Sequence, residues 1–202
     1  MKIKQIESFL LTFMLSFMLF ACSGPQVTRI DSNEEVDLSG YWNDTDSRLV
    51  AEEMLNDSFA NTWLADFKKT NGRKPRVIIG LVLNKTEEHI STETFVKDLE
   101  RSYINSGKVT FVASKDQRVE VRAERADQAV NSKAGTAKNQ VQETAADFML
   151  KGQINSIFDA NKKAQLKYYQ VELELINLET NETVWIGQKK IKKVVSRKSY
   201  KV

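Results

Sequence analysis

Hydrophobic residues recur along this chain with two different periods, and the change from one period to the other separates predicted helices from predicted strands. From Ser47 to Lys69 the apolar positions follow helical spacing, and neither Pro nor Gly interrupts them. We therefore expect one helix over this range. Asp44 and Asp46 are typical helix-start residues, and Asn71-Gly72 is a typical helix end.

Three further helices are predicted between residues 91 and 146. The first carries Phe95, Leu99 and Tyr103 on one face. The second opens at a capping box, Ser114-x-x-Gln117, in which each residue's side chain bonds to the other's backbone. The three helices are expected over residues 92–104, 115–129 and 137–146.

The strands are predicted from two kinds of pattern. Arg76–Leu83 is apolar on both faces, which is typical of a central strand, and Val109–Ala113 indicates a shorter one. From Phe148 onwards the period becomes 2, and turn residues at 159–162 and 180–182 divide the segment into three strands. In the middle strand the stripe from Tyr169 to Leu175 is apolar, and Tyr168 faces the other way.

The predicted order is α-β-α-β-α-α-β-β-β, without an internal repeat. The first two strands are joined through a helix, so they are parallel if they are neighbours. The last three form an antiparallel meander, and helices must cover at least one face of the sheet. The sequence therefore predicts a single small α/β domain with a mixed sheet.

The first 22 residues resemble the leader of a bacterial lipoprotein. Lys2 and Lys4 precede an apolar run from Phe9 to Phe20, which is too short to cross a bilayer. Leu19-Phe20-Ala21-Cys22 then matches a lipobox, in which the thiol accepts diacylglycerol and the small residue before it fits the peptidase. We expect cleavage before Cys22 and a lipid anchor on that sulfur, rather than an ordinary secretory leader with a chance cysteine.

These patterns divide the chain into four parts. Residues 1–21 are the predicted signal peptide, and residues 22–40 are the lipidated cysteine with a flexible tether. The domain itself is expected over residues 41–195, and 196–202 is a basic carboxy-terminal tail. A tether of this length has a typical span of ~25 Å.

Composition excludes several classes of function. The net charge of +3 falls to +2 once Lys2, Lys4 and Glu7 leave with the leader, so nucleic acid is not an expected partner. A single cysteine and a single histidine permit no disulfide within the chain and no His/Cys metal cluster. We expect no cofactor and no metal.

Long stretches of the chain are similar to the LpoB family, the outer-membrane lipoproteins that activate penicillin-binding proteins. The similarity is clearest over Trp42–Leu55, Arg73–Ser114, Glu124–Gln128 and Tyr168–Lys193. This resemblance implies a fold like the amino-terminal domain of TolB, with a sheet flanked by helices. It also implies a non-catalytic, monomeric regulator that faces the periplasm and activates a class A penicillin-binding protein, a peptidoglycan synthase.

The tether departs from the pattern of the well-known enterobacterial members, whose linker is long and disordered. With a short tether, three alternatives stay open: the protein is retained at the inner membrane, the gap to the synthase is smaller, or the partner is a different protein. Two other functions are alternatives. One is a structural or secretion lipoprotein related to the curli-pore family, whose lipid-facing strands need ~9–11 alternating residues each. The other is an envelope glycan hydrolase.

Candidate chemistry is weak by comparison. His89 lies in a polar connection without a nucleophile or orienting partner, so it is interpreted as a loop histidine. The acidic pairs Glu52/Glu53 and Glu87/Glu88 are interpreted as solvated surface rather than as a catalytic pair. Tyr168 is the one candidate partner contact, because exposed tyrosines often anchor interfaces.

Three further features have competing interpretations. Trp42 and Trp185 are expected to pack in or beside the core. The lysines from Lys189 onwards are expected to protect an edge strand, although anionic lipid or an acidic partner is the alternative.

Overall fold

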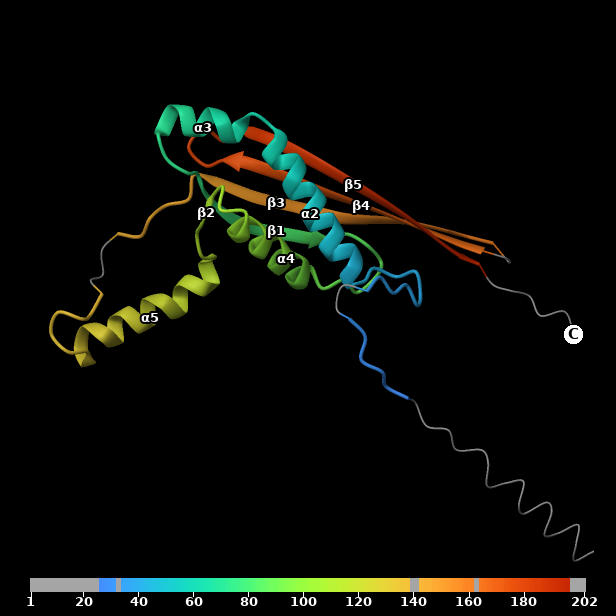
Figure 1. The fold of residues 1–202 in the computed structure, drawn as a ribbon, viewed down its shortest axis with the longest axis horizontal. Coiled ribbons are helices and arrows are strands. Elements are labelled where there is room, and N and C mark those ends of the chain that lie inside the picture. The colour runs from blue at the N-terminus through green and yellow to red at the C-terminus, as the bar shows by residue number, and fades with distance from the viewer. Residues whose placement is uncertain (1–25, 32–33, 139–141, 162–163, 197–202) are drawn as a thin grey trace, which may run out of the picture. The chain divides into compact units, whose positions relative to one another are not determined.

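The computed structural model describes residues 26–31, 34–138, 142–161 and 164–196. The amino-terminal part up to Glu34 and the part from Glu35 onwards are two separate compact units. The second unit holds the described helices and strands, which Figure 1 labels. The helices are α2 (Asp44–Ala60), α3 (Trp63–Asn71), α4 (Thr92–Asn105) and α5 (Lys115–Asn131). The strands are β1 (Arg76–Asn84), β2 (Thr110–Phe111), β3 (Phe148–Ala160), β4 (Ala164–Asn177) and β5 (Thr183–Ser196).

The single helix predicted over residues 47–69 is wrong, because the chain breaks it into α2 and α3. Asn61 adopts an extended conformation at the end of α2. Its Oδ1 accepts a hydrogen bond from the Trp63 backbone N–H at 3.3 Å, and Trp63 Nε1 donates to the carbonyl oxygen of Ser58 at 2.7 Å. Asn side chains compete with the helix for backbone groups, so the break follows from Asn61 together with the tertiary position of Trp63.

The predicted start of α5 is confirmed, because Ser114 and Gln117 form the predicted capping box. Ser91 caps α4. The short helix predicted over residues 137–146 is wrong within the described residues, since 137–138 and 142–146 are irregular. Glu143 lies in this segment and binds Arg118, Arg122 and Arg125 of α5. These ion pairs hold the irregular segment against α5. The alanines of the segment form no helical turn there.

The sheet has the strand order β2-β1-β3-β4-β5. β1 pairs in parallel with both β2 and β3, and β3, β4 and β5 form the predicted antiparallel meander. The predicted fold class, a small α/β domain with a mixed sheet flanked by helices, is therefore confirmed. β2 is shorter than the predicted strand 109–113, because only two of its residues pair with β1.

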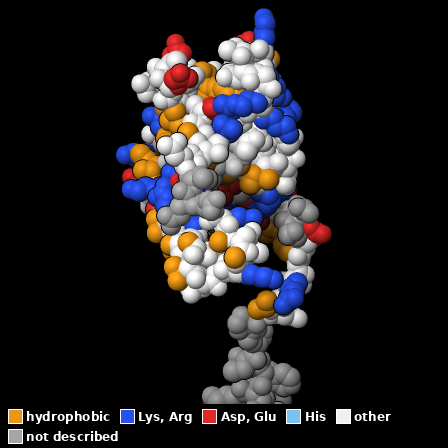
Figure 2. All heavy atoms as spheres, turned by 90° about the vertical axis from the view of Figure 1, so that its left-hand side faces the viewer, with side chains coloured by type: hydrophobic (Ala, Val, Ile, Leu, Met, Phe, Trp, Pro, Cys, Tyr) orange, Lys and Arg blue, Asp and Glu red, His pale blue; other side chains and the backbone are white. Residues whose placement is uncertain are grey.

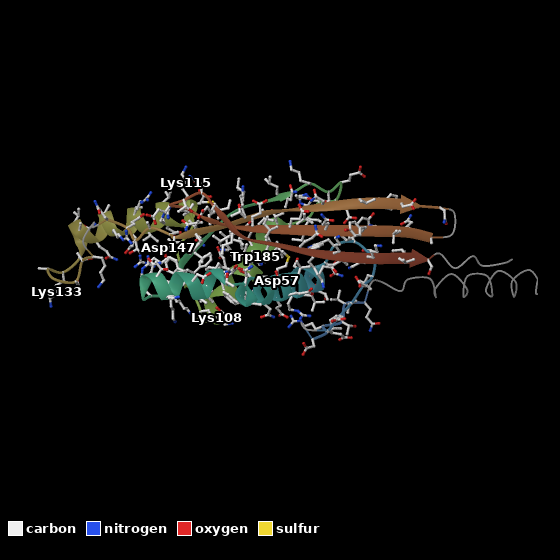
Figure 3. All side chains as sticks on the ribbon, turned by 90° about the horizontal axis from the view of Figure 1, so that it is seen from above. Asp57, Lys108, Lys115, Lys133, Asp147 and Trp185 are labelled. Atoms are coloured by element: carbon white, nitrogen blue, oxygen red, sulfur yellow. The ribbon has the colours of Figure 1, made fainter. Side chains whose placement is uncertain are left out.

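Helices α2 and α4 cover one face of the sheet, as Figures 1 and 3 show. The core lies between these helices and the sheet, and its fully buried members include Phe95, Leu99, Leu150, Leu173, Leu175 and Tyr103. Burial raises the pKa of Tyr103 to about 12, so its hydroxyl is neutral across the physiological range. α5 differs from the other helices because it buries none of its residues.

Candidate partner-contact surface

Tyr168 lies on the sheet face that the helices leave uncovered, here called the open face. Buried residues alternate with half-buried ones along β4, and Lys167, Tyr169 and Val171 point to the helix side. Tyr168 points the opposite way, as the sequence predicted, and pairs with Ile157 on β3 and Lys192 on β5. Figure 3 shows this side of the sheet without a covering helix along the long strands. The position of Tyr168 leaves its ring available to a partner.

The middle of the open face is a hydrogen-bonded polar cluster centred on Glu172. Its carboxylate accepts hydrogen bonds from the side-chain amides of Gln153 at 3.0 Å, Gln170 at 2.5 Å and Gln188 at 3.2 Å. These three bonds lower the pKa of Glu172 below its ordinary value. Tyr168 Oη donates to Gln170 Oε1 at 2.8 Å, which fixes the ring at the edge of the cluster. The result is a rigid polar platform held by its own side chains.

Large apolar side chains surround this platform and are exposed to solvent. Leu81 and Leu83 stand on β1, Ile157 on β3, and Ile186 on β5. The register places Ile186 beside Glu174, and Leu83 beside Gln153, so all belong to the open face or its β1 edge. A polar centre with an apolar margin is typical of a surface that contacts another protein.

A hollow of about 1050 Å³ lies at the end of the sheet beside α3. Trp63, Phe67 and Leu178 contribute apolar walls, and Arg73 and Asp147 contribute a charged one. Arg73 binds Asp147 through two bonds of 2.7 Å and lies over the Phe67 ring at 5.0 Å. Figure 2 looks onto this end and shows hydrophobic side chains among Lys, Arg and acidic groups.

Strand β5 is an edge strand, which agrees with the interpretation of its lysines as edge protection. Two of them also hold the helix side together: Lys189 binds Glu53, and Lys193 binds Asp46 at 2.7 Å. The tail predicted from residue 196 lies outside the described residues, apart from Ser196 at the end of β5.

Glu88, one of the candidate catalytic acids, makes contacts within the fold. Glu88 accepts hydrogen bonds from Lys167 Nζ at 3.0 Å and from Tyr169 Oη at 2.7 Å. Burial and the Glu88 carboxylate raise the pKa of Tyr169. His89, its neighbour in the chain, is exposed. In the described ranges no three His, Cys, Asp or Glu side chains lie close enough together to hold a metal ion.

The two tryptophans pack as expected. Trp42 makes edge-to-face contacts with Phe95 and Tyr169, with ring centroids 6.2 Å and 5.6 Å apart. Trp185 is buried, and its Nε1 donates to Asp57 Oδ2 at 2.9 Å, a pair labelled in Figure 3. Neither ring is therefore a free anchor for a partner.

The proposed lipid-attachment residue, Cys22, lies outside the described residues. Among the helices that the structure describes, none has both the length and the apolar character needed to span a bilayer. Sequence reasoning placed Tyr168 correctly on its strand face, but it missed the glutamine cluster around Glu172. Alternation along β4 alone placed Gln170 and Glu172 on one face, whereas Gln153 and Gln188 join them only through the strand register.

The sequence matches the model of one protein family, described as peptidoglycan-synthase activator LpoB, over residues 46–191. The chain belongs to the LpoB family. No curated protein matches its sequence. The match begins inside α2 and ends inside β5, so it includes strands β1 to β4 and most of β5.

Solved structures with similar folds include members of the LpoB family. The C-terminal domain of LpoB from Salmonella enterica is 17% identical, with 63% of this chain and 91% of that chain covered and a TM-score of 0.36. LpoB from E. coli is 15% identical over 88% of this chain and 84% of that one, with a TM-score of 0.38. Lipoprotein GNA1162 from Neisseria meningitidis is 8% identical over 62% and 88%, with a TM-score of 0.40.

Proposed function

We propose that this protein is a lipid-anchored regulator that binds and activates a class A penicillin-binding protein by protein–protein contact. The family match over residues 46–191 carries the proposal, because the family is described by activation of a peptidoglycan synthase. The protein acts without chemistry of its own. It shifts its partner toward an active state by binding that state more tightly.

The open face is the proposed contact surface. It offers what a protein interface needs: a preorganised polar centre around Glu172, an aromatic side chain at Tyr168 and an apolar margin at Leu81 and Ile157. Its side chains are already held in place by one another, so little conformational entropy is lost when a partner docks. Aromatic anchors carry a large share of binding energy, which makes Tyr168 the residue to test first.

The anchor is the second part of the proposal. A lipobox ends at Cys22, and acyl chains on that sulfur hold the protein at a membrane. We place it at the outer membrane facing the periplasm, with retention at the inner membrane as the alternative. The short tether then concentrates the domain near its membrane, and it reaches the synthase only where their separation is small.

The decisive experiment uses a purified class A penicillin-binding protein from the same organism. Its rate of glycan-strand polymerisation is measured in detergent, with and without this protein. We expect at least a severalfold faster polymerisation and saturable binding. The Tyr168→Ala variant should bind the synthase at least tenfold more weakly, as expected for an anchor worth about 1.4 kcal/mol or more. No acceleration and no binding by the native chain would refute the proposal.

The matched control is Val130→Ala on α5, because Val130 is highly exposed but distant in the fold from the open face. It should activate like the native protein. The anchor is tested separately with Cys22→Ser in cells: the variant should leave the membrane fraction, and mass spectrometry of the native amino-terminal peptide should detect the acyl chains. A membrane-bound Cys22→Ser protein would contradict the anchor.

A further inference from the structure

Three arginines of helix α5 converge on one carboxylate from another part of the chain. We call them the arginine cluster: Arg118, Arg122 and Arg125, which share a helical face because they are spaced four and three residues apart. Arg122 binds both oxygens of Glu143, through Nε at 3.0 Å and Nη2 at 2.7 Å. Arg125 Nη1 donates to Oε1 at 3.2 Å, and Arg118 Nε lies 3.6 Å from Oε2. Arg122 therefore shows the planar, two-bonded geometry by which arginine recognises a carboxylate.

The cluster holds more positive charge than Glu143 neutralises. Three guanidinium groups face a single carboxylate, and Lys138 borders the same pocket. The hydrogen bond from Arg122, with the charges of the three arginines, holds the pKa of Glu143 below its ordinary value, so Glu143 is ionised at neutral pH. Acidic residues of the same helix line a separate hollow: Glu120, Glu124 and Asp127. The excess positive charge on the arginine face therefore attracts a further anion.

Arg118 carries a hydrogen-bond donor without an acceptor. Its Nε is buried, and no atom of the described residues accepts a hydrogen bond from it, since the 3.6 Å to Glu143 is too long for one. Burial of an unbonded N–H costs free energy, so most such groups in folded proteins have a partner. A ligand oxygen within reach of this Nε supplies the missing acceptor.

A pocket of about 610 Å³ adjoins the arginine cluster. Its charged wall comes from Arg118, Arg125 and Lys138. Its apolar wall comes from side chains that are small or β-branched: Val112, Ala113 and Val121. The volume lies within the ~300–1,000 Å³ typical of sites for small ligands. The pocket therefore fits a short chain that carries several carboxylates between small apolar groups.

Helix α5 can exchange one carboxylate for another without disturbing the core. It buries none of its own residues, and Figure 1 shows it standing apart from α2 and α4, the helices that cover the sheet. Its ion pairs with Glu143 are partly exposed to solvent, and ion pairs of this kind are weak. A ligand carboxylate can therefore compete with Glu143 for the arginines.

We propose that the arginine cluster binds uncross-linked stem peptides of peptidoglycan, whose free carboxylates take the place of Glu143. These short peptides join alanines to residues that keep a free carboxylate, so their methyl groups match the apolar wall and their carboxylates match the arginines. The inference rests on the proposed function, because a regulator of a peptidoglycan synthase meets the product of that synthase. α5 contributes no residue to the open face, so the protein can bind the synthase and its product at the same time.

The test titrates the full-length acylated protein in detergent with the disaccharide-tetrapeptide that a muramidase releases from peptidoglycan. Calorimetry follows binding. Two control probes are the same muropeptide with its carboxylates amidated, and a linear peptide of L-alanine and L-glutamate with equal net charge. We expect saturable binding of the native muropeptide and none of the amidated one. The linear peptide should bind roughly fivefold more weakly, because its carboxylates are spaced differently.

Substitutions at the site separate specific contacts from net charge. Arg122→Gln and Arg125→Gln should each weaken muropeptide binding about fivefold, the upper range for a partly exposed ion pair. Glu143→Gln should strengthen it about threefold, because it removes the internal carboxylate that competes for the arginines. The matched control is Asp127→Asn, which changes the net charge by the same amount beside the other hollow and should leave the affinity unchanged. Circular dichroism checks that each variant keeps the native fold.

Equal binding of the native and amidated muropeptides would overturn the proposal, and so would a Glu143→Gln protein that binds no more tightly than the native one. Binding of the linear acidic peptide as tight as that of the muropeptide would also overturn it, and would assign the cluster to an acidic segment of a protein. Activation of the synthase is measured separately, in the polymerisation assay. A native protein that activates the synthase but binds no muropeptide refutes only this inference, whereas one that binds muropeptide without activating refutes only the proposed function.

Discussion

The two faces of the sheet show how one set of strands serves stability on one side and recognition on the other. Trp185 and Ile186 are neighbours on β5, yet Trp185 is 4% exposed and Ile186 is 66% exposed. The first packs under α2 and donates to Asp57, whereas the second lies on the open face beside Glu174. Both side chains are large and apolar. Their different roles follow only from which face the helices cover, so burial, not residue type, distinguishes core from contact surface.

Truncation of the two neighbouring side chains, Trp185 and Ile186, tests this difference between the faces directly. Trp185→Ala should lower the free energy of unfolding by about 3–5 kcal/mol, because it opens a cavity and leaves Asp57 without its donor. Ile186→Ala should change it by less than about 0.5 kcal/mol. Urea unfolding followed by circular dichroism measures both. Similar losses for the two variants would show that something covers the open face in the folded protein.

Gly152→Ala tests how closely the strands approach beneath the helices. A Cβ on Gly152 would collide with the backbone carbonyl of Glu172 and the side chain of Leu173, and neither can move far within the sheet. We expect a loss of about 1–3 kcal/mol in the free energy of unfolding, the range for overpacking a core.

The matched control for this substitution is Gly80→Ala on β1. Its Cβ would meet mainly the flexible end of Met149, which can turn aside. A smaller loss is therefore expected in thermal unfolding. A Gly152→Ala protein as stable as the native one would contradict the close approach of β3 and β4.

Asp147→Asn probes the charged wall of the hollow beside α3. Burial raises the pKa of Asp147, but hydrogen bonds from Arg73 and the Arg76 backbone outweigh it, so the pKa lies below its ordinary value. Because the folded pKa is lower than the unfolded one, this carboxylate stabilises the fold at neutral pH. That stabilisation is lost as pH falls below about 4.

The half-exposed Arg73 side chain limits this effect to about 1 kcal/mol at pH 7. The free energies of unfolding of the native and Asp147→Asn proteins should differ by this amount at neutral pH, and the difference should shrink as pH falls below about 4. A difference that stays constant with pH would refute the assigned ion pair.

Tyr168→Ala should lower the free energy of unfolding by only about 0.5 kcal/mol, because the ring lies on the open face and its hydroxyl has one internal partner, Gln170. The same variant is expected to lose at least tenfold in binding to the synthase. Calorimetric unfolding and a binding titration on one preparation measure both. A large loss of stability would assign Tyr168 to the fold rather than to the partner.

Much of the fold was predictable because its signals are local. The capping residues Ser91 and Ser114 and the alternation along β4 depend on neighbours within four residues. The two wrong helix predictions arose where distant contacts override local preference. Trp63 bonds back to Ser58 and divides the first helix, and Glu143 is drawn to the arginines of α5 instead of joining a helix of its own.

The sequence by itself determined the α/β order, the meander, the strand face of Tyr168 and the resemblance that identified the family. Only the tertiary structure decided that the helices leave one face bare, that three glutamines from three strands meet around Glu172, and that Asp37 binds Lys193 on β5. The physical reason is the range of the interactions. Periodicity and capping act along the chain, whereas strand register and helix coverage bring together residues that are far apart in it.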